Sequence, residues 1–275
     1  MIIDTHHHFW KYNPGAFDWI DEKMATIRKN FLPKDLKKTL SDTEVEGVVS
    51  IQARQCLEET DWLLAMALEN DFIKGVVGWL PLTNENIQQV LERYAVNPWL
   101  KGVRHVVQDE PDPDFILGKD FNRGISLLKA YGLVYDILIV RHQLPNTIRF
   151  VDQHPDQAFV LNHMAKPKIK NNEIKAWGQN LKELGKRENV SCKISGMVTE
   201  ADFKSWTEEQ LQPYFDMVLE AFGASRLMYG SDWPVCLVAT SYSNWLSLVK
   251  RKLSGLSQEE QHQIFFQNAV KAYQL

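Results

Sequence analysis

The chain has 275 residues, of which 31 are Lys or Arg, 35 are Asp or Glu, and 44% are hydrophobic. A net charge of −4 without a basic block excludes the electrostatic footprint of a nucleic-acid-binding protein, and no apolar run reaches the roughly 18 residues of a membrane span. The cysteines, Cys56, Cys192 and Cys236, follow no metal-finger spacing, so we expect reduced thiols and a cytoplasmic protein.

Short β-branched runs alternate with segments of helical periodicity along the whole chain. The predicted strands are 2–8, 47–53, 73–82, 101–107, 133–140, 158–163, 190–196 and 227–232. The predicted helices include 58–71, 85–95, 121–131, 173–188, 208–222 and 257–273, the last of which opens with a capping box. Eight strands alternating with helices predict an α/β fold, a TIM (β/α)8 barrel, in which residues 1–275 form a single domain.

The first predicted strand carries three consecutive histidines in the sequence IIDTHHHFW. Alternate residues of a strand share a face, so Asp4, His6 and His8 are expected on one face, with His7 on the other. Two imidazoles about 7 Å apart along a strand can ligate one metal ion or grip one substrate.

Barrels of this kind place their chemistry at the carboxyl ends of the strands. The polar residues there include His6, His8, Gln52, Arg54, Arg104, His105, Arg141, His142, His163, Lys166, Lys193, Ser195 and Asp232. Such a bias toward one end favours an active site. Lys193 and Asp136 lie inside strands and are interpreted equally well as buried ion-pair partners or as catalytic groups.

Four of these residues are predicted to take part in ester hydrolysis, which needs a nucleophilic water, a polarised carbonyl and a stabilised oxyanion. Asp232 is predicted to accept the proton of the water. His6, His8 and His163 either ligate one zinc ion together with Asp232, or donate hydrogen bonds to the carbonyl oxygen.

The substrate contacts are predicted from neighbouring positions. Arg104 offers a fork of donors for a carbonyl, hydroxyl or carboxylate, and His105 is a further catalytic candidate. Adjacent residues of a strand point in opposite directions, so only one of these two is expected to enter the site. Residues 9–32 form a long aromatic insertion that is expected to cover the substrate. The other predicted substrate-binding residues are Gln52, Trp10, Lys166 and His142.

The motifs IDTHHHFW, GVRHVVQDEPD, NHMAKP, CKISG and YGSDWPV occur in this order along the chain. Together they resemble the amidohydrolase-related lactonases, the group that contains L-fuconolactone and L-rhamnonolactone hydrolases. The resemblance runs from end to end. It implies a distorted (β/α)8 barrel that hydrolyses small sugar lactones, and its motif residues map onto His6, His8, His163 and Asp232.

The chain departs from the wider superfamily at two places. Members with two metal ions have a bridging Lys or Glu after strand four and a ligand His after strand five, where this chain has Arg104, His105 and the run YDILIV. The residue before the strand-six histidine is usually Asp in these lactonases and is Asn162 here. The first departure argues against a binuclear centre and leaves at most one divalent ion, for which zinc is the best match to these ligands.

Two alternative functions are compatible with the same residues. Aromatic-acid decarboxylases share the H-x-H start and the final G-S-D, but their strand-six motif is rich in glycine, unlike NHMAKP. A binding barrel without activity is the non-enzymatic alternative, and the joint presence of all four site residues argues against it. The predicted partner is a small lactone substrate, and binding to nucleic acid or to a membrane is not expected. The sequence of one chain does not predict the oligomeric state.

Overall fold

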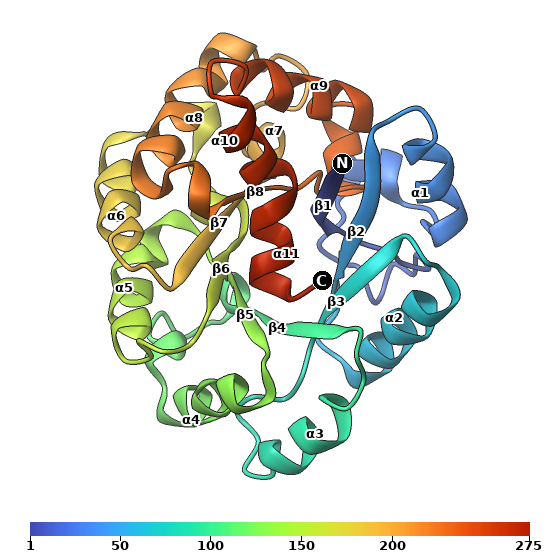
Figure 1. The fold of residues 1–275 in the computed structure, drawn as a ribbon, viewed down its shortest axis with the longest axis vertical. Helices are drawn as coiled ribbons and strands as arrows, with labels where there is room; N and C mark the ends of the chain where they lie inside the picture. Colours follow the sequence, from blue (N-terminus) through green and yellow to red (C-terminus); the bar gives the residue numbers. More distant parts are fainter.

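The computed structural model describes all 275 residues and shows eight parallel strands in the order β1 to β8 around a barrel (Figure 1). The strands are β1 Ile2–His7, β2 Val45–Ile51, β3 Ile73–Gly78, β4 Leu100–Val106, β5 Val134–Leu138, β6 Phe159–Leu161, β7 Val190–Ile194 and β8 Leu227–Tyr229. Every predicted strand is present, so the predicted (β/α)8 fold is confirmed.

Helices surround the barrel and follow most strands (Figure 1). They are α1 Pro33–Leu40, α2 Leu57–Glu69, α3 Ile87–Tyr94, α4 Lys119–Leu128, α5 Leu144–Asp152, α6 Lys175–Gly185, α7 Met197–Glu200, α8 Glu208–Phe222, α9 Tyr242–Lys252, α10 Gln258–His262 and α11 Asn268–Tyr273. The predicted helix 208–222 has the observed bounds of α8. The predicted helix 257–273 is divided by a π-helical turn at Gln263–Gln267. None of the helices combines the length and the apolar character needed to cross a membrane.

Several strands end earlier than predicted because the backbone leaves the extended conformation. Strand β6 stops at Leu161, and the residues His163, Met164, Ala165 and Lys166 have φ of 49°, 51°, 60° and 47°. Strand β8 stops at Tyr229, and Asp232 also has a positive φ, 58°. Left-handed backbone costs an L-residue about 1–2 kcal/mol, so the surrounding structure must hold these residues in place.

The barrel is closed between β1 and the segment that follows β8. Asp232 N donates to His6 O and His8 N donates to Trp233 O, both at 2.7 Å. A register shift between Asp4 and His7 interrupts the regular pairing of β1 with β2. The expected shared face of Asp4, His6 and His8 is therefore wrong for Asp4, whose carboxylate accepts hydrogen bonds from the Tyr242 hydroxyl of α9 and the Ser231 amide.

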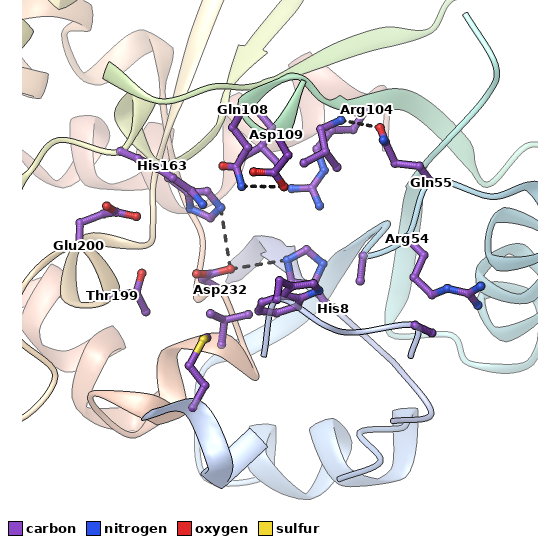
Figure 2. Close-up of a pocket in the computed structure, with 18 of the residues that line it drawn as sticks. His8, Arg54, Gln55, Arg104, Gln108, Asp109, His163, Thr199, Glu200 and Asp232 are labelled. Atoms are coloured by element: carbon purple, nitrogen blue, oxygen red, sulfur yellow. Dashed lines mark hydrogen bonds and ion pairs between the residues drawn. The ribbon is translucent and has the colours of Figure 1, made fainter. Parts of the chain in front are cut away.

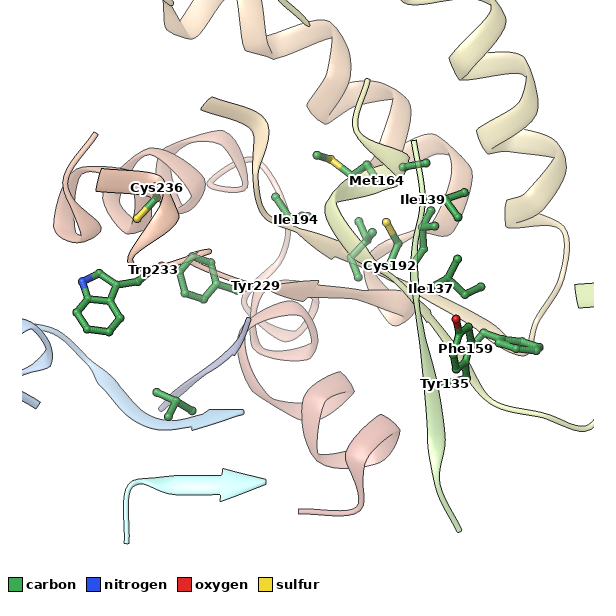
Figure 3. Close-up of a cluster of buried hydrophobic side chains, with 14 of the residues drawn as sticks. Tyr135, Ile137, Ile139, Phe159, Met164, Cys192, Ile194, Tyr229, Trp233 and Cys236 are labelled. Atoms are coloured by element: carbon green, nitrogen blue, oxygen red, sulfur yellow. The ribbon is translucent and has the colours of Figure 1, made fainter. Parts of the chain in front are cut away.

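Two hydrophobic clusters form the core. The larger comprises 67 buried residues, and Figure 3 shows a part of it from β5 to β8 and the segments that follow them, including Tyr135, Phe159 and Tyr229. The smaller cluster of nine residues comes from the strands and α11: Ile3, Val49, Ile51, Val77, Val134, Val160, Met228, Ala269 and Tyr273. Apolar side chains of α11, near the C-terminus of the chain, therefore pack against the strands.

Helix α11 covers the amino ends of the strands, over the centre of the barrel in Figure 1. Lys101, at the start of β4, donates to Gln274 O at 2.9 Å just beyond this helix. The Tyr273 hydroxyl reaches further inside and donates to Asp136 Oδ1 of β5 at 2.8 Å. One end of the barrel is thus closed by the C-terminal segment, and the opposite end remains for a cavity.

Candidate active site

A cavity of about 650 Å³ opens at the carboxyl ends of the strands (Figure 2). Five of the predicted site residues line it: His8, Arg104, His163, Lys166 and Asp232. His6 lies fully buried beside them. The structure therefore brings together the four residues predicted for water activation or metal binding.

One carboxylate oxygen is surrounded by three imidazoles. The distances from Asp232 Oδ1 to the Nε2 atoms of His8, His6 and His163 are 3.6, 3.8 and 3.9 Å. His6 and His8 come from the first strand segment, His163 from the left-handed turn after β6, and Asp232 from the segment that closes the barrel. Three distant parts of the sequence thus converge on one point.

Electrostatics keeps the three imidazoles neutral near neutral pH. Burial lowers the pKa of His163 to about 3. Burial likewise lowers the pKa of His6 and of His8, and His6 also faces the cations Arg104 and Lys193. Burial alone raises the pKa of Asp232, but His163, His8 and Lys166 outweigh it, so the pKa of this carboxyl is lowered. A carboxylate among neutral imidazoles is the form that accepts a proton or ligates a metal ion.

The arrangement fits one divalent metal ion. The ligand atoms of His6, His8 and Asp232 all lie within 4.8 Å of one another, and His163 lies outside this compact group. A tetrahedral zinc site separates its ligand atoms by about 3.4 Å, close to the observed distances from Asp232 Oδ1. His8 Nδ1 lies 2.9 Å from the carbonyl oxygen of Ile51, which orients the ring and leaves Nε2 free for ligation.

The left-handed turn after β6 places His163 and Lys166 in the cavity. His163 Nδ1 lies 2.9 Å from Ser195 Oγ, which fixes the ring. The ring packs against Gly196, where a Cβ atom would lie 2.6 Å from His163 Nδ1. Gly196 also has a φ of +68°, so glycine is required at this position by both conformation and space.

Arg104 lines the cavity and is held in place by several acceptors. Its NH2 donates to both the side chain and the backbone carbonyl of Gln52, and its NH1 donates to Asn162 Oδ1 at 3.2 Å. NH1 also lies 3.4 Å from His6 Nε2. Burial lowers the pKa of Arg104 to about 10, which leaves the guanidinium charged at neutral pH. Of the adjacent residues Arg104 and His105, it is Arg104 that lines the cavity.

Lys193 and Asp136 form an ion pair beneath the site. Lys193 Nζ lies 2.6 Å from Asp136 Oδ2, and neither side chain has any exposed surface. Asn162 Nδ2 donates to the same carboxylate at 2.9 Å, and Lys193 Nζ lies 3.4 Å from His6 Nδ1. Neither residue of the pair lines the cavity, so the structure favours the ion-pair interpretation over the catalytic one.

Four predicted site residues lie outside the cavity. His105 lies outside the cavity because its Nε2 is bonded to Glu110 Oε1 at 2.6 Å and its ring stacks on Phe115. His142 is exposed in a separate depression. Trp10 is fully buried behind His8 and donates to Lys29 O. Gln52 is buried beneath the cavity and positions Arg104.

Further residues of the cavity were not predicted. The insertion 9–32 does form one wall, but through Gly15, Ala16, Trp19 and Met24 rather than through Trp10. Charged side chains also come from the rim and from α7: Arg54, Asp109 and Glu200. Arg54 stood among the strand-end residues without a role. Asp109 and Glu200 lie several residues beyond their strands, where no strand-end signal points to them.

The comparisons with known proteins agree with this geometry. The amidohydrolase family matches residues 3–275, and this chain belongs to that family. An L-fucono-1,5-lactonase of Burkholderia multivorans is 36% identical over 290 residues, which cover 100% of this chain and 96% of that protein. The predicted resemblance to the lactonase group is confirmed.

Solved structures show the same fold. A crystal structure of an amidohydrolase from Burkholderia multivorans with bound zinc has a TM-score of 0.97 and 35% identity, and covers 100% of this chain and 99% of that chain. A dihydroxybenzoic acid decarboxylase from Polaromonas has a TM-score of 0.68 at 12% identity over 100% of this chain and 97% of that chain. The second likeness concerns the fold alone.

Proposed function

We propose that this protein hydrolyses a small sugar lactone, of the L-fuconolactone or L-rhamnonolactone kind, to the aldonic acid. The observation that carries the proposal is the buried Asp232 carboxylate with three imidazole nitrogens within 3.9 Å, at the base of a cavity of about 650 Å³. The full-length similarity to an L-fucono-1,5-lactonase supports a lactone as the substrate.

Asp232 accepts a proton from the attacking water, since its lowered pKa keeps the carboxylate ionised and the carboxylate lines the cavity. The water oxygen then adds to the lactone carbonyl carbon. Arg104 stabilises the oxyanion, because its charge is permanent and its position is fixed by Gln52 and Asn162. As the ring carbon–oxygen bond breaks, the proton held by Asp232 passes to the departing ring oxygen.

His6, His8 and Asp232 would hold a single zinc ion, and the His163 imidazole would lie beside it. A bound zinc ion polarises a carbonyl and lowers the pKa of water. The zinc in the structure of the Burkholderia multivorans relative supports this part of the proposal. Without the ion, the His8 and His163 imidazoles, which line the cavity, would donate or accept hydrogen bonds there.

The two alternatives are less well supported. Decarboxylation rests on a relative that shares the fold at 12% identity, and an inactive barrel does not account for the converging side chains. We also propose that residues 1–275 form one domain. The three free cysteines support a reducing, cytosolic location.

The test measures acid release from L-fucono-1,5-lactone above its spontaneous hydrolysis, with zinc-loaded and chelator-treated protein in parallel. We expect turnover, and one zinc ion per chain by elemental analysis. His8→Ala should lose the ion, whereas His262→Ala, at an exposed position, should keep it. Full activity of zinc-free protein would assign the imidazoles to hydrogen bonding, and the absence of turnover in both forms would refute the lactonase proposal.

A further inference from the structure

One wall of the cavity is made by helix α7, across from His8 and Arg54 (Figure 2). Two polar side chains of this helix, Thr199 and Glu200, line the cavity. The Thr199 hydroxyl already donates to Gly196 O at 2.8 Å. The half-buried Glu200 carboxyl makes no hydrogen bond or ion pair with the chain. It is therefore the polar group of α7 that is available to a ligand.

The backbone on both sides of Glu200 is fixed. Before it, Gly196 packs directly against the His163 ring. After it, Asp202 accepts hydrogen bonds from Lys204 N and Ser205 Oγ and pairs with Lys170 Nζ at 2.9 Å. Because both flanks are anchored, the Glu200 side chain is presented to the cavity from a defined position, as a recognition residue requires.

The charges of the cavity wall balance one another. Three cations, Arg54, Arg104 and Lys166, stand against three carboxyl groups, Asp109, Glu200 and Asp232, so the formal sum is 3 − 3 = 0. A wall of this kind suits an uncharged ligand with many polar groups. Burial raises the pKa of Glu200, and Lys166 acts in the opposite direction. Either form of the carboxyl bonds a hydroxyl, as an acceptor when ionised and as a donor when protonated.

We propose that Glu200 is a specificity residue that hydrogen-bonds a ring hydroxyl of the lactone, an inference that rests on the proposed lactonase function. Opening the ester needs Asp232, the imidazoles and Arg104, whereas Glu200 lies on the wall beside them (Figure 2). A lactone without hydroxyl groups removes water from Glu200 and gives it no partner, which is how a polar site rejects such an analogue. Glu200 thus selects polyhydroxylated lactones.

The test compares two variants of similar shape, Glu200→Met and Glu200→Gln, on two lactones of one ring size. L-Fucono-1,5-lactone carries ring hydroxyls, and δ-valerolactone carries none and is followed both as a substrate and as a competitor. For Glu200→Met we expect kcat/KM on the sugar lactone to fall about 10- to 100-fold, the range of a lost hydrogen bond to a charged group. Hydrolysis and binding of δ-valerolactone should not weaken and should strengthen in Glu200→Met, because this lactone then no longer removes water from an unpartnered carboxyl, and Glu200→Gln should lie between wild type and Glu200→Met.

Glu69, exposed at the end of α2, provides the control, and Glu69→Gln should leave both lactones unaffected. Equal losses on the two lactones in Glu200→Met would show that Glu200 acts in the chemistry or the fold, and would overturn the proposal. Unchanged kcat/KM on the sugar lactone would overturn it as well. If wild-type protein hydrolyses neither lactone, the proposed function itself fails and the role of Glu200 falls with it.

Discussion

The two ends of the barrel differ in the kind of side chains that they bury. At the carboxyl ends of the strands lie buried polar side chains and five non-glycine residues in left-handed conformations, 163–166 and Asp232. At the amino ends, α11 packs apolar side chains such as Ala269 against the strands. Five of the seven non-glycine residues with positive φ, and many buried polar side chains, are therefore gathered where the chemistry is proposed, and the opposite end supplies ordinary hydrophobic stability to hold them there.

Between the two ends, the ion pair of Lys193 and Asp136 connects them. Asp136 binds Tyr273 of the C-terminal helix through Oδ1, and Lys193 through Oδ2. Lys193 in turn approaches His6 of the site. The comparison predicts three kinds of variant: those at the carboxyl ends change activity, those at the amino ends change stability, and those in the ion pair change both.

Asp232→Asn should give the largest effect. The amide keeps the shape of the side chain and tolerates the left-handed backbone, but it cannot accept the proton of water. We expect kcat to fall about 10²- to 10⁴-fold with little change in the thermal unfolding midpoint. Asp71→Asn, at an exposed position before β3 at the amino ends, serves as the control and should change neither quantity. Near-normal kcat in Asp232→Asn would remove this residue from its role as the base.

Lys193→Met should destabilise the fold by about 3–5 kcal/mol, because it leaves the buried Asp136 carboxylate without its cation. Denaturant unfolding measures the loss, and activity should fall as well because Lys193 contacts His6. The double variant Lys193→Met/Asp136→Asn removes the uncompensated charge and should recover part of the stability. An unchanged free energy of unfolding in the single variant would contradict the description of the pair as a link between the two ends.

Two glycines in the same left-handed conformation, one at each end of the barrel, allow a direct comparison with the smallest expected effects. Gly196 has φ +68° at the carboxyl ends, and Gly132 has φ +67° at the amino ends. A Cβ at Gly132 would meet Gln274 at 3.9 Å, an ordinary contact, whereas at Gly196 it would meet His163 Nδ1 at 2.6 Å. Gly132→Ala should therefore lower the free energy of unfolding by about 1–2 kcal/mol and leave the activity unchanged.

Gly196→Ala should carry a similar conformational cost and also displace His163, so that kcat/KM falls about 100-fold. Steady-state kinetics and thermal unfolding of the two alanine variants, measured side by side, separate the two contributions. Equal activity of both variants would show that the position of His163 does not limit the reaction.

Much of this architecture follows from the sequence. The β-branched runs predicted all eight strands, because buried parallel strands require such residues on both faces. The rule that polar residues at the carboxyl ends of strands converge correctly brought together His6, His8, His163 and Asp232. These successes depend on local composition and on one general property of barrels.

The remaining features depend on partners that are distant in the sequence. Alternation along β4 indicated that Arg104 and His105 diverge, but hydrogen bonds to Gln52, just after β2, and to Asn162, just after β6, show which one faces the cavity. His142 was placed at a strand end by the same rule, yet it lies in a short helical turn whose side chain points to solvent. Glu200 is six residues beyond the end of β7, so only the path of α7 brings it to the wall.

The hydrogen bonds that close the barrel between β1 and the segment after β8 affect the order in which the protein folds. The backbone bonds that join His6 to Asp232 and His8 to Trp233 connect residues from opposite ends of the chain, and they carry the site residues themselves. During synthesis the first strand emerges long before the last, so these bonds form only when β8 has docked. Asp232 therefore joins the three imidazoles only when the barrel closes, and a chain whose β8 has not docked lacks the proposed base.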